Sequence, residues 1–100
     1  YGDRRYRPLG RVRLRALVTD ARDSIFTPCK YIVDNVRVIS GSSPKPIREI
    51  VSYRGRFREQ AKEGDVVIAE GALERVENDE IFYRVLIGEN PQDILIPHSN

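Results

Sequence analysis

The sequence predicts a mainly β domain, an OB-like five-stranded Greek-key barrel with one short helix between strands three and four. Apolar residues alternate with polar ones in several segments, and Gly, Pro or Asn-Asp turns separate these segments. Their order is three strands, a helical segment and two strands, which is the order of an OB-fold. A five-stranded sheet covered by one helix but not closed into a barrel is the structural alternative.

The expected strands cover residues 9–20, 30–40, 47–54, 66–76 and 81–87. A short apolar run at residues 94–96 is expected to add a last edge segment. We expect residues 1–8 to be an arm or linker remnant, residues 9–97 a single β domain, and residues 98–100 a tail.

The first two strands each have a distinctive pattern. In the first, arginines alternate with Val12, Leu14 and Ala16, which gives one basic face and one apolar face. In the second, the apolar phase slips around Asp34 and Asn35, which predicts a β-bulge and a sharp bend. The second strand ends at a segment with a glycine and two prolines, which cannot continue a ladder of hydrogen bonds.

The second half of the chain contains the expected helix and the last strands. Residues 55–63 have good helix formers and no β-branched residue, so we expect one or two helical turns there. In the fourth strand, the residues expected to face the interior are Val67, Ala69, Gly71 and Leu73. Gly71 suits a tight bend of a barrel because it has no side chain. Asn78 and Asp79 predict a hairpin turn into the fifth strand.

Charge is distributed unevenly along the chain. Residues 1–58 carry 14 Lys and Arg against 5 Asp and Glu, residues 59–100 carry 3 against 10, and the balances of +9 and −7 give the net +2. Arginine supplies 14 of the 17 cations, and its guanidinium binds phosphate and stacks on bases. Two interpretations stay open. The basic half is a nucleic-acid footprint, or it pairs with the acidic half across neighbouring strands.

The sequence provides candidates for nucleic-acid binding. Those for phosphate contacts are Arg11, Arg13, Arg15, Arg54, Arg56 and Arg58. Those for stacking on unpaired bases are Tyr31 and Tyr53. Phe57 is either part of that surface or a core anchor of the expected helix. Ion pairs from the first-strand arginines to Glu70, Glu74 or Glu77 would remove most of the support for binding.

No catalytic constellation is present in the sequence. Asp20 and Asp23 lack the strand spacing that lets two carboxylates share a metal ion. Cys29 and His98 are the only residues of their types, so this chain alone cannot form a structural zinc site. Packing in the core is the favoured role of Cys29. We therefore expect no metal and no cofactor in this chain.

Composition also bears on the source and location of the protein. Without a membrane-length apolar run or a signal-peptide core, the expected location is the cytoplasm. The chain begins at Tyr1 and contains no Met, so we expect a fragment of a longer protein. The absence of Met and Trp, the single Cys and the high charge favour a thermophilic source.

Several stretches of the sequence resemble a known family. Residues 6–10, 23–31, 48–57 and 71–76 resemble the C-terminal region of archaeal predicted nucleotidyltransferases, and "IFTPCKY" and "SYRGRF" are the most specific stretches. In that family, an upstream domain similar to the DNA polymerase β superfamily carries a Gly-Ser motif and paired aspartates for nucleotide and divalent metal. These 100 residues contain none of those motifs, so no catalytic role transfers to them.

The resemblance implies a non-catalytic accessory domain of a nucleotidyltransferase. We expect it to hold nucleic acid, single-stranded or structured RNA rather than duplex DNA, beside its own upstream catalytic domain. A membrane is not an expected partner, and the oligomeric state stays open. The alternative is a structural module for interdomain docking or dimerisation that binds no nucleic acid.

Overall fold

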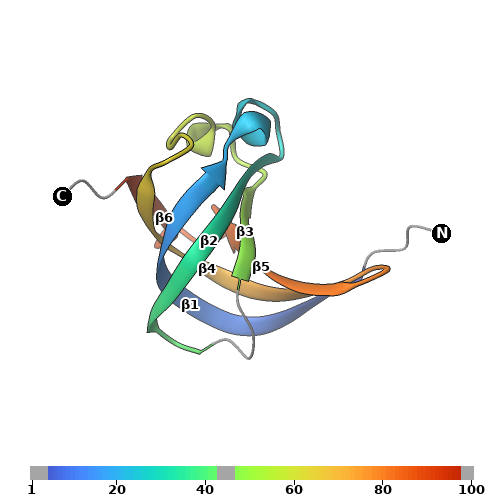
Figure 1. Ribbon diagram of the computed structural model, residues 1–100. Helices are drawn as coiled ribbons and strands as arrows, with labels where there is room; N and C mark the ends of the chain where they lie inside the picture. Colours follow the sequence, from blue (N-terminus) through green and yellow to red (C-terminus); the bar gives the residue numbers. More distant parts are fainter. Residues whose placement is uncertain (1–4, 43–46, 98–100) are drawn as a thin grey trace.

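The computed structural model describes residues 5–42 and 47–97, and within them the domain is mainly β (Figure 1). The strands are β1 (Arg5–Asp20), β2 (Cys29–Ser40), β3 (Ile47–Ser52), β4 (Val66–Glu77), β5 (Ile81–Ile87) and β6 (Ile94–Pro97). Two short 3-10 helices, η1 (Arg22–Ile25) and η2 (Gly55–Phe57), lie in the connections after β1 and β3.

Five strands form a ring. Their order is β1-β2-β3-β5-β4, and β4 pairs with β1 to close it. Strands β3 and β5 are parallel, whereas the other neighbours are antiparallel. Closure depends on the length of β1, which pairs with β4 over residues 5–17 and with β2 over residues 13–20. Figure 1 shows β1 bending strongly so that it belongs to both sides of the ring.

The sixth strand lies beside the ring. Residues 94–97 of β6 pair with residues 67–70 of β4, next to the part of β4 that pairs with β5. This confirms the last edge segment expected from the apolar run at residues 94–96.

The first strand is longer than the sequence indicated. Residues 5–8, expected to form an arm or linker remnant, are the beginning of β1 and pair with residues 74–77 of β4. The pairing shifts between Pro8 and Arg11, and Gly10 has a φ of 100° there. The sequence concealed this continuity because a proline and a glycine interrupt the alternating pattern.

The bulge expected in β2 is confirmed. Arg15 pairs with Arg37 and Leu17 pairs with Asp34, so β2 contains one residue more than β1 over this stretch. Asn35 lies in the extra length with a φ of 52°, a left-handed conformation that Asn tolerates better than most residues. The bulge bends β2 where the ring curves.

The segment between β3 and β4 contains less helix than the expected one or two turns over residues 55–63. Only Gly55–Phe57 form a 3-10 turn. Arg58 is extended, with φ −68° and ψ 138°, and Glu59 has a φ of 56°, so no helix continues past Phe57. The segment still covers the core, because Phe57 and Ala61 are both buried in it.

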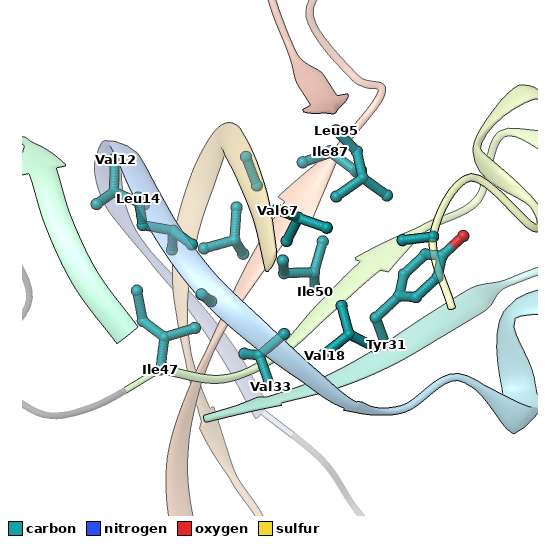
Figure 2. Close-up of a cluster of buried hydrophobic side chains, with 14 of the residues drawn as sticks. Val12, Leu14, Val18, Tyr31, Val33, Ile47, Ile50, Val67, Ile87 and Leu95 are labelled. Carbon is teal, nitrogen blue, oxygen red and sulfur yellow. The ribbon is translucent and has the colours of Figure 1, made fainter. Parts of the chain in front are cut away.

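The core fills the inside of the ring. Figure 2 shows its side chains converging from β1, β2, β3, β4, β5 and β6. In β4, the four residues expected to face inward, Val67, Ala69, Gly71 and Leu73, are all buried, which confirms the alternation. Burial of this apolar surface is the main stabilising contribution to the fold.

Candidate nucleic-acid interface

A pocket lies on the outer face of the ring, over the neighbouring strands β2, β3 and β5. Its volume is about 330 Å³, at the lower end of the range for small-molecule sites. We call it the aromatic pocket, and its lining residues are Tyr6, Asp23, Phe26, Pro28, Lys30, Glu49, Val51, Tyr53 and Arg84. They come from β1, the β1–β2 connection, β2, β3, the end of β3 and β5.

Three aromatic side chains around the pocket are exposed. The exposed fractions are 42% for Tyr6, 57% for Phe26 and 49% for Tyr53. Phe26 lies on the connection after η1, whereas Tyr53 follows directly on β3. Exposed rings at the edge of a sheet are stacking surfaces for planar ligands such as nucleobases.

A row of charged residues crosses the outer face at this pocket. Arg84 of β5 pairs with Glu49 of β3 on one side and with Glu74 of β4 on the other, so the three side chains share one face. Arg84 donates from Nε to Glu74 Oε1 at 2.7 Å, and its guanidinium lies 4.2 Å from the centroid of the Tyr6 ring. The cation therefore holds Tyr6 against the sheet.

The environment keeps Arg84 charged. Burial lowers its pKa, but the hydrogen bond to Glu74 and the charge of that carboxylate raise it by more, with a further contribution from the hydroxyl of Tyr53. The net result is a pKa above the ordinary arginine value. Arg84 is thus a fixed, largely desolvated cation at the base of the aromatic pocket.

Glu49 has a different environment. Its side chain is only 6% exposed, and its ion-pair partner among residues 5–42 and 47–97 is Lys30, with Nζ 4.0 Å from Oε2. The same Nζ lies 4.0 Å from the carboxylate of Asp23. The aromatic pocket therefore has two cations and two carboxylates in its lining, Lys30, Arg84, Asp23 and Glu49. This balance favours a ring over a phosphate as its occupant.

Of the two tyrosines expected to stack on bases, one lies at this site and one does not. Tyr53 lines the aromatic pocket and is exposed. Tyr31 is 0% exposed and belongs to the core, so the prediction that it stacks on bases is wrong. Tyr31 faces inward because it pairs with Ile50, which is also in the core. Phe57 is buried too, in agreement with its interpretation as a core anchor.

The arginines of β1 are outward-facing, as expected, but two of them have acidic partners. Arg11 Nη2 lies 2.6 Å from Asp93 Oδ1 and 3.4 Å from Glu70 Oε2. Arg13 Nε lies 3.7 Å from Glu70 Oε1, and these two residues are direct partners across β1 and β4. Of the two interpretations left open by the sequence, pairing with the acidic half therefore holds for Arg11 and Arg13. These ion pairs remove most of the support that the β1 arginines gave to nucleic-acid binding, so such a function has to depend on other residues.

Arg15 differs from its two neighbours on β1. It pairs with Arg37 across β1 and β2, and both side chains line a small hollow beside the bulge in β2. Like charges placed directly opposite each other repel. Among Arg11, Arg13 and Arg15 of β1, Arg15 is therefore the best candidate for a phosphate contact, because a phosphate would relieve its repulsion with Arg37.

The second arginine cluster surrounds η2. Arg54 Nε donates to the carbonyl of Gly88 at 3.3 Å and lies 3.7 Å from Glu89. The guanidinium of Arg56 stacks at 4.6 Å over the ring of Phe57. Arg54, Arg56 and Arg58 are all exposed, and they follow directly on Tyr53 of the aromatic pocket. Arg54 is adjacent in sequence to Tyr53, just as Arg5 and Arg7 are adjacent to the exposed Tyr6.

Four important residues of the aromatic pocket were missed by the sequence-based prediction, namely Tyr6, Phe26, Glu49 and Arg84. Tyr6 lay in the expected arm, and Phe26 lay between the first two expected strands. A signal existed for Phe26, since a large aromatic residue in a polar loop has no strand face on which to be buried. Glu49 and Arg84 show no such signal, because single charged residues on strands are ordinary outward-facing positions.

We also looked for reactive or metal-binding side chains outside the aromatic pocket. Cys29 is buried in the core, as favoured from the sequence, and burial raises the pKa of its thiol. Residues 5–42 and 47–97 contain no group of three or more His, Cys, Asp or Glu able to hold a metal ion. His98 lies outside the described residues. In the described ranges no helix is long and apolar enough to cross a membrane.

Comparison with known proteins gives no match. A scan against protein-family models, a search of curated proteins and a search of solved structures each found nothing similar to this chain.

Proposed function

We propose that this domain is a non-catalytic accessory module that binds single-stranded nucleic acid, RNA in preference to duplex DNA. The observation that carries the proposal is the aromatic pocket, where Tyr6, Phe26 and Tyr53 expose their rings around buried charged groups. Unpaired bases stack on such rings, whereas bases in a duplex are not accessible to them.

We also infer that the ring is an OB-like Greek-key barrel. Support comes from the strand order β1-β2-β3-β5-β4, closed by β4 on β1, with β3 parallel to β5. OB-folds bind oligonucleotides on the face of strands two and three and with the loop between strands one and two. The aromatic pocket occupies the corresponding position, with Lys30 on β2, Glu49 on β3 and Phe26 in the β1–β2 connection.

In this proposal the pocket and the nearby arginines have different roles. The pocket holds a base, since its charged lining groups are balanced. The backbone phosphates contact the exposed arginines after β3, Arg54, Arg56 and Arg58. Because Arg11 and Arg13 already have acidic partners, they contribute less to phosphate binding than the sequence indicated.

The resemblance of four stretches to archaeal predicted nucleotidyltransferases supports a particular setting for this module. There it would hold RNA beside an upstream catalytic domain, in the cytoplasm, and that domain would supply the nucleotide and divalent metal. The proposal for the domain itself does not depend on this setting, because the aromatic pocket lies within the present chain.

The test is fluorescence anisotropy of a labelled single-stranded RNA titrated with the domain at roughly 50 and 200 mM salt. We expect binding that weakens with salt. Phe26→Ala and Tyr53→Ala should each cost about 1–3 kcal/mol of binding free energy. Ile81→Ala is the control, since Ile81 is 49% exposed at the start of β5 but is not part of the pocket lining. Equal affinities for all three variants would contradict the proposal.

The second candidate function is interdomain docking or dimerisation. It is favoured by two neighbouring exposed apolar residues, Ile25 and Phe26, which are 50% and 57% exposed on the β1–β2 connection. A docking module predicts no RNA binding at either salt concentration. Sedimentation of the isolated domain then detects a dimer directly, and Ile25→Ser should dissociate it.

A further inference from the structure

Glu49 is a carboxylate of the aromatic pocket with little exposed surface. It lies on the outer face of β3, between Ile32 of β2 and Arg84 of β5 in the strand registers. Its side chain is 6% exposed, and the contact it makes within the described residues is Lys30 at 4.0 Å, beyond hydrogen-bond distance. Among the described residues, the buried side-chain atom without a hydrogen-bond partner is Nε of Arg75 and not an oxygen of Glu49. The Glu49 carboxylate therefore opens onto the aromatic pocket that it lines, where a ligand can donate hydrogen bonds to it.

The groups around Glu49 limit the chemistry of a ligand that could donate hydrogen bonds to it. Stacking rings above the carboxylate favour a planar ligand with N–H groups on its edge. A charged ligand is not favoured, because the two cations and the two carboxylates of the pocket lining balance. A neutral heterocycle with adjacent N–H donors satisfies both requirements.

We propose that the aromatic pocket recognises guanine in single-stranded RNA through Glu49 and Lys30, an inference that rests on the proposed function. The Watson–Crick edge of guanine presents N1–H and N2–H side by side, which matches the two oxygens of one carboxylate. The neighbouring O6 is an acceptor, and the ammonium of Lys30, 4.0 Å from Glu49 Oε2, is its donor. The base stacks against Phe26 and Tyr53.

The other bases match this pair of groups less well. Adenine and cytosine each offer one amino donor next to a ring acceptor, so one oxygen of Glu49 stays unpaired. Uracil places carbonyl acceptors on both sides of its single N–H, and one of them would face the carboxylate. The expected order of affinity is therefore guanine first, adenine and cytosine next, and uracil last.

The experiment compares five RNA pentamers that have uridine at every position except the centre, which is guanine, hypoxanthine, adenine, cytosine or uracil. Hypoxanthine is guanine without the N2 amino group, so it removes one donor and leaves the protein unchanged. We expect the guanine pentamer to bind about 5- to 100-fold more tightly than the uracil pentamer, with hypoxanthine between them.

Glu49→Gln should remove this preference, because an amide cannot accept both hydrogen bonds. Glu63→Gln is the matched control, since Glu63 is exposed between η2 and β4 and lies outside the pocket lining. Circular dichroism of both variants verifies that they are folded, and the hypoxanthine comparison tests the proposal if Glu49→Gln is not.

The results separate the two proposals. A guanine preference that Glu49→Gln abolishes and Glu63→Gln retains supports recognition by Glu49. Equal, salt-dependent binding of all five pentamers overturns guanine recognition and leaves the RNA-binding function standing. No binding of any pentamer at roughly 50 mM salt overturns both, and preferential binding of a peptide rich in arginine would instead identify a protein partner.

Discussion

The hydroxyl of Tyr31 donates a hydrogen bond of 2.6 Å to the backbone carbonyl of Phe57 and accepts one of 2.9 Å from the backbone N–H of Gln60. Figure 2 shows the Tyr31 ring among the core side chains, with its hydroxyl at the edge of the cluster. Two hydrogen bonds made by one side chain of β2 thus hold the connection between β3 and β4 over the core.

Tyr31→Phe should destabilise the domain by about 1–3 kcal/mol, because it leaves a carbonyl and an N–H near the core without their partner. Urea unfolding followed by circular dichroism measures the change. Tyr6→Phe, the same chemical change at an exposed position, should alter the free energy of unfolding by less than about 0.5 kcal/mol. Loss of RNA binding by a fully folded Tyr31→Phe variant would contradict a purely structural role for Tyr31.

At Gly71, strand β5 approaches the backbone of β4 so closely that a side chain would not fit. A Cβ atom at this position would overlap the carbonyl oxygen of Leu86 and lie 2.8 Å from Cγ2 of Ile87, both on the neighbouring β5. Gly71→Ala should therefore cost about 1–3 kcal/mol of stability through overpacking, as a shift in the midpoint of urea unfolding.

The control for Gly71 is Gly55→Ala. A Cβ atom at Gly55 would meet nothing closer than Nε of Arg58, at 3.7 Å, and the backbone there has no positive φ. Its effect should be neutral or slightly stabilising, since alanine restricts the unfolded chain. Equal destabilisation by both substitutions would mean that the close approach of β5 to Gly71 is not the cause.

The sequence predicted the strands well because their patterns are local. Alternation in β1 and β4 identified the inward residues, and the phase slip at Asn35 identified the bulge. The path of residues 5–8 could not be predicted in this way. Their strand conformation depends on pairing with residues 74–77, and no local pattern reports that distant partner.

The candidate site was predicted only in part, for a similar reason. A two-residue period assigns Tyr53 and Tyr31 equally well to a stacking surface, but only the register with β3 shows that Tyr31 points into the core. The neutralisation of Arg13 depends on its register with Glu70, 57 positions further along the chain. Both corrections therefore depend on how the strands pair, which no local pattern in the sequence reports.

Arg11 contacts two carboxylates that should contribute very differently to stability. Asp93 has a side chain 1% exposed, and its other oxygen accepts hydrogen bonds from the backbone N–H groups of Gly88 and Asn90 at 2.9 and 3.1 Å. Glu70 is more exposed, and its contacts to Arg11 and Arg13 are 3.4 and 3.7 Å long. The first carboxylate organises the turn between β5 and β6, whereas the second forms surface ion pairs.

Asp93→Asn should lower the free energy of unfolding by about 1.5–3 kcal/mol, because an amide N–H then faces another donor in a buried position. Glu70→Gln, the same change from carboxylate to amide, should cost less than about 1 kcal/mol, since exposed ion pairs contribute little and are screened by salt. Urea unfolding of both variants at low and high salt provides the comparison. A similarly small loss for the two variants would show that the β5–β6 turn does not depend on Asp93. A similarly large loss would show that the contacts of Glu70 stabilise β1 more than its exposure indicates.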